Sequence, residues 1–142
     1  MAGYGNPWHY RQTDQIMAST YLLEILLSDS RTIRIGKLGR FFFPKGHYLY
    51  VGSAQRNFRK RIERHMRKRK NMHWHIDYLL AHARVTRVWS CDRSEEQTAE
   101  ILCQTIPIPV PHFGSSDKNS RSHLFFGRLT QDISELSLAL FK

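Results

Sequence analysis

The sequence predicts an α+β domain with a small antiparallel central sheet flanked by helices. Several short segments alternate apolar and polar residues with a period of two, which is typical of strands with one buried face. Between these segments, apolar residues recur at helical spacing. The chain has 142 residues, a length at which one domain with one core is the usual outcome. The order of the segments favours helices that pack on an antiparallel sheet.

The first part of the chain differs in composition from the rest. Gly3, Gly5 and Pro7 stand among scattered polar residues, and no continuous apolar block occurs before the strand pattern that starts at Thr20. We therefore expect residues 1–18 to form a flexible N-terminal leader and residues 19–142 to form a single domain.

Three strands are predicted in the first third of the domain. Residues 20–27 are rich in strand-forming side chains, and the turn residues 28–30 follow them. Residues 32–35 alternate with period two, so we expect them to pair with 20–27 in a hairpin. After a turn at 44–46, residues 47–52 form the third expected strand, which ends at a glycine.

Two helices, a strand and a third helix follow. Phe58, Ile62 and Met66 form an apolar stripe at helical spacing, and a second stripe predicts a helix over 72–83. Residues 85–91 alternate as a strand. Two acidic residues favour the start of a helix over 95–105, because carboxylates stabilise the first turn.

The C-terminal part begins with prolines that exclude regular structure. Pro107, Pro109 and Pro111 predict an extended loop. Residues 122–126 then form a last expected strand, and residues 134–141 a terminal helix.

Positive charge is concentrated in one of the expected helices. The chain has a net charge of +10, and the segment 56–70, with nine basic residues and one acidic residue, carries +8 of it. A charge run is usually a solvated helix face, but like charges of this density oppose helix formation unless a polyanion is bound. We expect this helix to contact nucleic acid through six of its side chains: Arg56, Arg59, Lys60, Arg64, Arg67 and Lys68.

Several other classes of protein are disfavoured. No apolar run reaches the ~20 residues that span a bilayer, so no membrane partner is expected. Cys91 and Cys103 form no disulfide framework, which favours a reduced, cytoplasmic protein. His73 and His75 lack a partner pair at zinc-ligand spacing, and the segment that holds them is better explained by packing and hydrogen bonds from helix to loop.

A few side chains combine into a candidate catalytic group. Tyr21 and Tyr50 lie in expected strands and could face the start of the basic helix, although strand tyrosines more often only pack. On that helix, Arg61 lies at the border of the apolar stripe and His65 falls inside it. A border arginine can be oriented by packing and still reach a phosphate.

Candidate ligands for a hard cation are scarce in this basic chain. Glu95 and Glu96 open a predicted helix, and Asp117 lies in a loop rich in glycine and serine. Ala99 and Leu102 follow Glu95 at helical spacing, so Glu95 is the one expected beside the buried face.

Together these residues resemble the GIY-YIG nuclease superfamily. Its core has a G-x-Y strand, a Y-[IV]-G strand and a helix with the pattern L-x-x-R-[IL]-x-x-H, followed by a metal-binding glutamate. The chain is most similar to a branch that occurs alone or fused to endonuclease-III-type DNA glycosylases. The shared motifs are G-x-Y-x-Y-V-G-S-A at 46–54, R-x-x-R-H at 61–65, W-H-I-D-Y-L-L at 74–80, and F-G-S-S-D…S-H-L-F within 113–125.

The resemblance implies a Mg²⁺- or Mn²⁺-dependent endonuclease that hydrolyses DNA phosphodiester bonds, in a structure-specific or repair-related role. Glu95 or Glu96 would hold the metal, Arg61 would neutralise phosphoryl charge, and Tyr21 would activate water. His65 is the competing base, or it orients Tyr50. The last motif adds Ser116, Asp117 and His123 as contributors from a loop. If the source is bacterial or archaeal, the implied location is the nucleoid.

The chain departs from the superfamily at three places, and two of them, the insertion between the tyrosines and Lys118, affect substrate choice. Ser19 stands where the first glycine is expected, and Lys118 stands where the branch often has cysteine. Tyr21 and Tyr50 are separated by 29 positions, so residues 32–44 form an insertion. A non-catalytic nucleic-acid-binding module is the alternative function, and RNA stays an alternative ligand because phosphate contacts carry no sugar identity. The oligomeric state is left open.

Overall fold

An antiparallel sheet of five strands forms the centre of the domain, in the order β6-β4-β1-β5-β7. The structure is a computed structural model that describes residues 19–115, 120–129 and 136–141. The strands of this sheet are β1 (Thr20–Leu27), β4 (Gly46–Ser53), β5 (Arg84–Cys91), β6 (Leu124–Phe126) and β7 (Leu138–Leu140). The protein is therefore of the α+β class that the sequence predicts.

Strand β1 is central because both of its edges and both of its faces are covered. It pairs along its whole length with β4 on one side and, from Thr20 to Leu26, with β5 on the other. Its nearly continuous apolar sequence suits this position, because a strand buried on both faces has no solvated side to fill with polar residues. Leu22 packs in the core on one face of the sheet and Leu23 in the core on the other.

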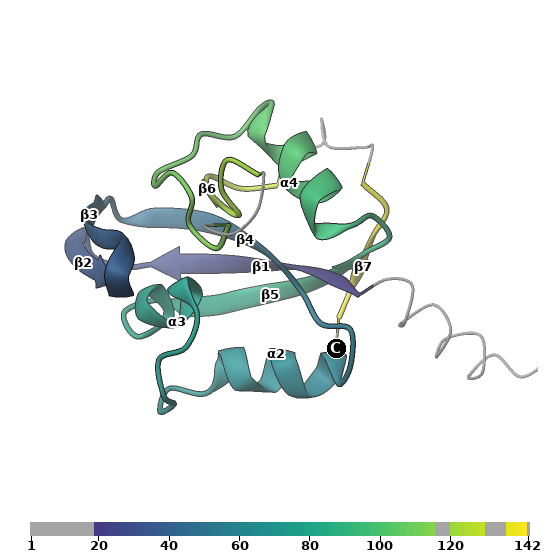
Figure 1. Ribbon diagram of the computed structural model, residues 1–142, viewed down its shortest axis with the longest axis horizontal. Helices are drawn as coiled ribbons and strands as arrows, with labels where there is room; N and C mark the ends of the chain where they lie inside the picture. The colour runs from purple at the N-terminus through teal and green to yellow at the C-terminus, as the bar shows by residue number, and fades with distance from the viewer. Residues whose placement is uncertain (1–18, 116–119, 130–135, 142) are drawn as a thin grey trace, which may run out of the picture.

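Helices cover both faces of the sheet. In Figure 1, α2 (Phe58–Met66) and α3 (His75–Leu80) lie below the strands, and α4 (Glu95–Cys103) lies above them. Ile62 and Ile76 join the core under α2 and α3, whereas Ala99 and Leu102 join the core under α4. The site described below lies where one end of the sheet meets α2 and α4.

The predicted hairpin between residues 20–27 and 32–35 is wrong. Strand β2 (Arg31–Ile35) instead pairs with β3 (Gly39–Phe43) in a separate two-stranded sheet, joined by a short 3₁₀ helix, η1 (Gly36–Leu38). Both edges of β1 are already occupied, so β2 finds its partner in the segment that follows it. Gly36 and Gly39 have φ values of 49° and 129°, which the tight connection requires and which side chains disfavour. We call residues 31–43 the ribbon.

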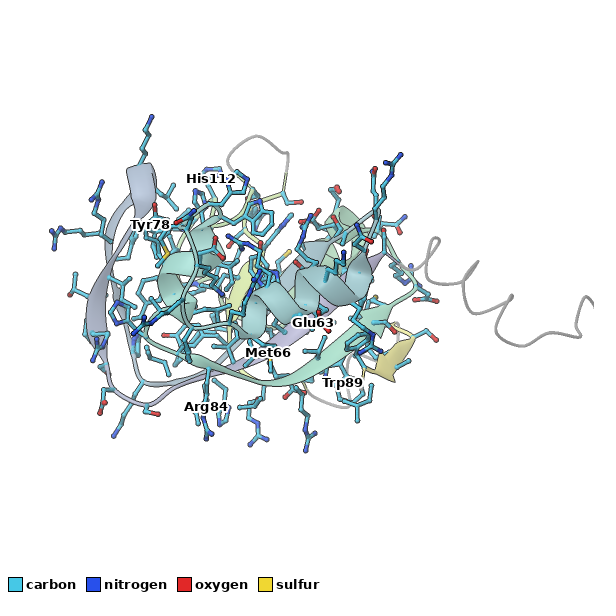
Figure 2. The ribbon with its side chains drawn as sticks, turned by 90° about the horizontal axis from the view of Figure 1, so that it is seen from below. Glu63, Met66, Tyr78, Arg84, Trp89 and His112 are labelled. Atoms are coloured by element: carbon cyan, nitrogen blue, oxygen red, sulfur yellow. The ribbon has the colours of Figure 1, made fainter. Side chains whose placement is uncertain are left out.

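The two helices below the sheet follow the predicted stripes in part: α2 loses Met66 from its stripe, and α3, over His75–Leu80, is shorter at both ends than the predicted 72–83. In α2, Ile62 and His65 are buried as expected, but Met66 is 52 % exposed, so the apolar stripe ends early. Figure 2 views α2 from outside the domain and labels Met66 and Glu63 on it. Helix α3 begins at His75 rather than at residue 72, because Trp74 is its N-cap and the Asp77 carboxylate caps the backbone before it.

The predicted terminal helix over 134–141 is also wrong in its described part. Leu138–Leu140 form β7, which pairs with β5. The free outer edge of β5 offers backbone hydrogen bonds that a short helix would not make, and Leu138 packs against the core on that side. Residues 134 and 135, and the expected leader over 1–18, lie outside the described part of the chain.

Candidate active site

A pocket of about 230 Å³ opens where β1 begins and β4 ends. It is built by residues from six separate stretches of the chain. They are Tyr21, Tyr50, Gly52, Ser53, Arg61, Trp74, Glu95 and Gly114. Both tyrosines, the arginine and one of the two glutamates singled out in the sequence therefore line the same hollow.

Tyr21 forms the inner wall of the pocket and is held in one position. Its side chain is 2 % exposed, and its hydroxyl shares a hydrogen bond of 2.7 Å with Nε2 of His65. The ring lies directly against Gly52 on the neighbouring strand. A Cβ at Gly52 would lie 2.4 Å from Cζ and Oη of Tyr21, closer than real Cβ contacts. The glycine of the Y-V-G motif is thus required by the tyrosine beside it.

His65 is buried behind Tyr21 and does not line the pocket. It is 3 % exposed, and its Nδ1 has no hydrogen-bond partner in the described residues. Burial, and then the positive charge of Lys70, lower the pKa of His65 to about 3. The imidazole is therefore neutral at physiological pH, and Nε2 can accept a hydrogen bond from Tyr21 when its hydrogen is on Nδ1. Its hydrogen bond goes to Tyr21, and its ring meets Tyr50 edge-on at 6.3 Å between centroids.

Tyr50 forms a second aromatic wall. It is 6 % exposed and meets Phe113 edge-on at 6.2 Å between ring centroids. Burial raises its pKa well above the ordinary value. The backbone of Gly114 passes close to this ring, since a Cβ there would lie 3.2 Å from Cε1 of Tyr50. The phenol is therefore protonated and rigidly packed.

Arg61 is oriented by contacts on two sides. Its Nη1 donates a hydrogen bond of 2.9 Å to the carbonyl oxygen of Ser53, and its Cζ lies 4.4 Å from the centre of the Trp74 ring. Its side chain is half-buried, as expected for the border of the stripe. Burial raises the pKa of Tyr21, and the nearby Arg61 guanidinium opposes that rise. The guanidinium is held in place before any ligand arrives.

Glu95, and not Glu96, supplies the pocket carboxylate. Glu95 is the first residue of α4 and is 9 % exposed, whereas Glu96 is exposed to solvent. Its Oε1 accepts a hydrogen bond of 2.9 Å from Oγ of Ser53. The capping Ser94 begins the helix directly before it, so the carboxylate lies at the helix end where negative charge is favoured.

His123 lies behind Glu95. It is completely buried, and its Nδ1 is 2.8 Å from Oε2 of Glu95, a contact that is an ion pair when His123 is protonated but is not aligned as a hydrogen bond. Ser115 is also buried, and its hydroxyl has no hydrogen-bond partner in the described residues. Ser116 and Asp117, which the sequence singled out in the same loop, lie outside the described part.

The donor set fits a hard divalent cation held by few protein ligands. Within residues 19–115, 120–129 and 136–141, no group of three or more His, Cys, Asp or Glu side chains could enclose a metal ion. Mg²⁺ commonly takes only one or two carboxylates and completes its shell with water and substrate phosphates. Glu95 in an open polar pocket, with the Ser53 hydroxyl beside it, meets that requirement.

Arg64 and Lys68, two of the predicted nucleic-acid contacts, are bonded to α3 and to the segment after it. Arg64 forms a bidentate ion pair with Asp77, with N–O distances of 2.9 and 3.0 Å, and its Cζ lies 4.3 Å from the centre of the Trp74 ring. Lys68 donates a hydrogen bond of 2.7 Å to the carbonyl oxygen of Ala83. Arg64 thus connects α2 to α3, and Lys68 connects the segment after α2 to the segment after α3.

The carboxylate of Asp77 holds the segment around Trp74 in place. Its carboxylate accepts hydrogen bonds from Arg64 and from the backbone N–H groups of His73 and Trp74. Burial alone would raise the pKa of Asp77, but these bonds outweigh burial and hold it below its ordinary value. The Nδ1 of His75 accepts a hydrogen bond from the backbone of Gly114. The expected packing and helix-to-loop role of this segment is confirmed.

The other predicted contacts lie on the outer side of the basic helix. Arg56, Lys60 and Arg67 are exposed, and the exposed Arg59 lies with its Cζ 4.8 Å from the centre of the Phe141 ring. A second hollow follows the helix and is lined by Arg64, Arg67, Arg69, Lys70 and Asn71. Positive charge therefore continues along the surface from the pocket past the end of α2.

Sequence reasoning missed the contribution of Trp74 to the pocket. The structure gives its ring two cationic neighbours, Arg61 and Arg64. The signal in the sequence was the position of Trp74 directly before a helix that has an acid, Asp77, in its first turn. In the structure, Asp77 pairs with Arg64. Gly114 belongs to the F-G-S-S-D motif, but no local pattern predicts that its backbone lies against Tyr50, which is far from it in the chain.

The fold and the pocket define an α+β domain with a buried tyrosine–histidine pair beside an arginine and a carboxylate. The sequence model of one family, described as a domain of unknown function (DUF123), matches residues 20–142, and the chain belongs to that family. A search of the curated proteins and a search of the solved structures found no match. No helix in the described residues is long and apolar enough to cross a membrane.

Proposed function

We propose that the protein is a metal-dependent endonuclease of the GIY-YIG type that hydrolyses phosphodiester bonds in DNA. The observation that carries this proposal is the convergence of Tyr21, Arg61 and Glu95, three residues far apart in the chain, on one pocket. A nuclease needs a group that activates water, a cation that neutralises the phosphoryl oxygens, and a ligand for a divalent metal ion. The pocket provides a candidate for each.

Arg61 is the group that would bind the scissile phosphate. Its backbone partner and the Trp74 ring hold the guanidinium at the wall of the pocket, with further N–H donors available to a ligand. A guanidinium matches two phosphate oxygens with parallel hydrogen bonds. Because it is already oriented, it would stabilise charge that grows in the transition state without a cost for reorganisation.

Tyr21 and His65 form the candidate path for the proton of the attacking water. Water at the pocket wall would give a proton to Oη of Tyr21 while the phenolic proton passes to Nε2 of His65, along the 2.7 Å hydrogen bond. His65 is too deeply buried to meet water itself, so it would act as a base through Tyr21. Burial is the main cause of the lowered pKa of His65, and the charges of Lys70 and Arg61 lower it further; a bound phosphate would offset these charges.

Glu95 is the residue that would hold a Mg²⁺ or Mn²⁺ ion, with the Ser53 hydroxyl next to it. When bound, such an ion supplies Lewis-acid stabilisation of a phosphate oxygen and of the leaving oxygen. His123 lies on the far side of the carboxylate and would orient it.

The substrate class follows from the charge around the pocket. The exposed side chains of Arg56, Lys60 and Arg67 extend the positive surface beyond Arg61, as contact with a phosphate backbone requires. DNA that is branched, damaged or partly single-stranded, in a role in repair, is the form we propose. The protein would then work in the cytoplasm, at the nucleoid if the source is bacterial or archaeal.

A cleavage assay with matched variants tests this proposal. Labelled duplex, single-stranded, flap and junction DNAs are incubated with the protein in Mg²⁺, in Mn²⁺ and in chelator. We expect cleavage that requires the metal and is abolished in Glu95→Gln. Glu96→Gln is the matched control, because Glu96 is the exposed neighbour in the same helix turn, and it should cleave normally. Equal activity of the two variants would remove Glu95 from the mechanism.

A non-catalytic nucleic-acid-binding module is the second candidate, and the exposed cations of α2 favour it independently of the pocket. Lys60→Ala combined with Arg67→Ala should make the salt dependence of duplex affinity less steep, by about 0.9 in the log–log slope for each phosphate that is no longer neutralised. Arg84→Ala with Arg87→Ala on β5 is the control. Binding with this signature, and no cleavage of any substrate in either metal, would favour the module over the enzyme.

A further inference from the structure

The ribbon is held rigidly against the rest of the domain through its inner face. Ile33, Ile35 and Phe43 are buried in the core that α2 and α3 share with the sheet. Arg31 forms a hydrogen bond of 2.7 Å to Nδ1 of His82, just after α3. Gly36 lies against the ring of Tyr78 on α3, with a Cβ there 3.3 Å from its nearest atoms. The outer face of the ribbon is therefore presented to solvent on a fixed support.

The outer face combines an exposed aromatic ring with opposed cations. Phe42 is 62 % exposed, more than the other exposed large hydrophobic residues of the described part. Arg34 and Arg40 face each other directly across the two strands, and both are exposed. Residues 31–45 contain five basic residues and no acidic residue. Like charges placed directly opposite destabilise a strand pair, so a polyanion bound at this face would relieve the repulsion.

The occupant that fits this face is a single strand of nucleic acid. A protein partner would match the exposed ring, but it would meet the opposed charges of Arg34 and Arg40 only with an acidic surface. Single strands present both a phosphate backbone and unpaired bases, and any base can stack on an aromatic side chain. In duplex DNA the bases are paired and stacked, so an exposed ring gains nothing there.

We infer that the ribbon is a second nucleic-acid-binding site, in which Phe42 stacks on an unpaired base while Arg34 and Arg40 bind the flanking phosphates. The inference deepens the proposed function and rests on it only in taking nucleic acid as the ligand. It assigns single-stranded regions, such as those of flaps and junctions, as part of the preferred substrate.

The position of the ribbon gives the reach of such a strand. The ribbon lies at the end of the central sheet where β1 ends and β4 begins, on the left in Figure 1, whereas Tyr21 and Gly52 pair at the other end. Six residues of strand separate Tyr21 from Leu27, a distance of about 20 Å at the usual rise. A single strand that engages both places therefore has to span at least this distance.

The test measures affinity for single-stranded DNA by fluorescence anisotropy in chelator, so that cleavage does not contribute. We expect Phe42→Ala to weaken binding of an oligonucleotide of about 12 nucleotides roughly tenfold, and Phe42→Trp to retain it. Leu140→Ala is the matched control, because Leu140 is another exposed apolar side chain, on the edge strand β7 of the central sheet, and its loss should leave affinity unchanged.

A strand of the same length with abasic sites separates stacking from charge. The loss caused by Phe42→Ala should disappear on the abasic strand, whereas Arg34→Ala with Arg40→Ala should weaken both strands alike. An equal effect of Phe42→Ala on both strands would overturn stacking. Unchanged affinity in Phe42→Ala would overturn the proposed site, and an acidic protein partner would then be the better explanation of the exposed ring. Because no cleavage is measured, an inactive Glu95 pocket would not alter these outcomes, and a failed ribbon would not alter the metal-dependent assay.

Discussion

The pocket and the ribbon carry charge and aromatic rings in two different ways. In the pocket, Tyr21 is hydrogen-bonded to His65, which lies 44 positions further along the chain, and Ser53 is hydrogen-bonded to Glu95, which lies 42 positions further along. The participating side chains are buried and depend on one another. In the ribbon, Arg34 and Arg40 are neighbours through local strand pairing and are exposed. A change in the pocket should therefore propagate, whereas a change in the ribbon should stay local.

The largest effect is expected from Arg61→Ala. Removing one preorganised donor to the developing phosphoryl charge should slow cleavage by about 100- to 1,000-fold, with only a modest loss of DNA affinity. The measurement is single-turnover cleavage beside anisotropy, with Arg87→Ala on β5 as the control for a lost exposed charge. Equal losses of binding and cleavage would make Arg61 an ordinary phosphate contact.

Gly52→Ala should disturb both the stability and the chemistry of the pocket. The new methyl group would lie 2.4 Å from the Tyr21 ring, and that ring is buried and hydrogen-bonded, so it cannot move aside easily. We expect a loss of about 1–3 kcal/mol in the free energy of unfolding, measured with urea.

A double-mutant cycle identifies the cause of that loss. Gly52→Ala combined with Tyr21→Leu should be more stable than the sum of the two single changes, because leucine lacks the ring atoms that clash with the methyl group. Simple additivity would contradict the interpretation that Gly52 makes room for Tyr21.

Acid should destabilise the pocket through His65. Its pKa is about 3 in the folded protein and near 6.5 in the unfolded chain, so between these values the unfolded state binds more protons. The free energy of unfolding should therefore fall as pH is lowered from about 6.5, by up to about 1.4 kcal/mol per pH unit. Urea unfolding at several pH values measures this slope.

His65→Gln should flatten the slope, because glutamine does not titrate. His82 also has a lowered pKa, from burial and then from Arg31, and acts in the same direction, but its exposed position makes its share small. A slope that stays the same in His65→Gln would show that other groups cause the acid sensitivity.

The smallest effect is expected in the ribbon, and it has the opposite sign. Arg40→Thr removes a positive charge that faces Arg34 directly, so the free energy of unfolding should rise by about 0.2–1 kcal/mol. Arg84→Thr on β5 is the matched control, because Arg84 pairs with the apolar Leu26. A clear loss of stability in Arg40→Thr would mean that the ribbon depends on this arginine for its structure.

The sequence predicted where most strands lie but not which strands pair with each other. Residues 20–27 and 47–52 have strong local patterns, and both form strands of the central sheet. The local pattern does not say that β4 and β5 occupy both edges of β1, since this pairing is decided by contacts far apart in the chain. The segment 39–43 was not expected as a strand either, although it contains three consecutive phenylalanines and pairs locally with β2.

The candidate site was predictable where helical spacing determines which face is buried. The burial of His65 and of Glu95 follows from the apolar residues at helical spacing around them. The partners of Arg64 and Lys68 did not follow, because Asp77 and Ala83 come from a segment whose approach to α2 depends on the whole core. Helical spacing thus predicted which side chains face the core, but not which basic side chains would form bonds within the protein.

The indole of Trp74 lies under the guanidinium groups of both Arg61 and Arg64. Tryptophan emission responds to nearby charge, so this ring is a natural optical reporter of occupancy. A phosphate bound to Arg61 would change the charge beside the indole and thereby its fluorescence, while Arg64 stays bound to Asp77. The protein thereby carries an unlabelled sensor through which ligand arrival can be timed by stopped flow.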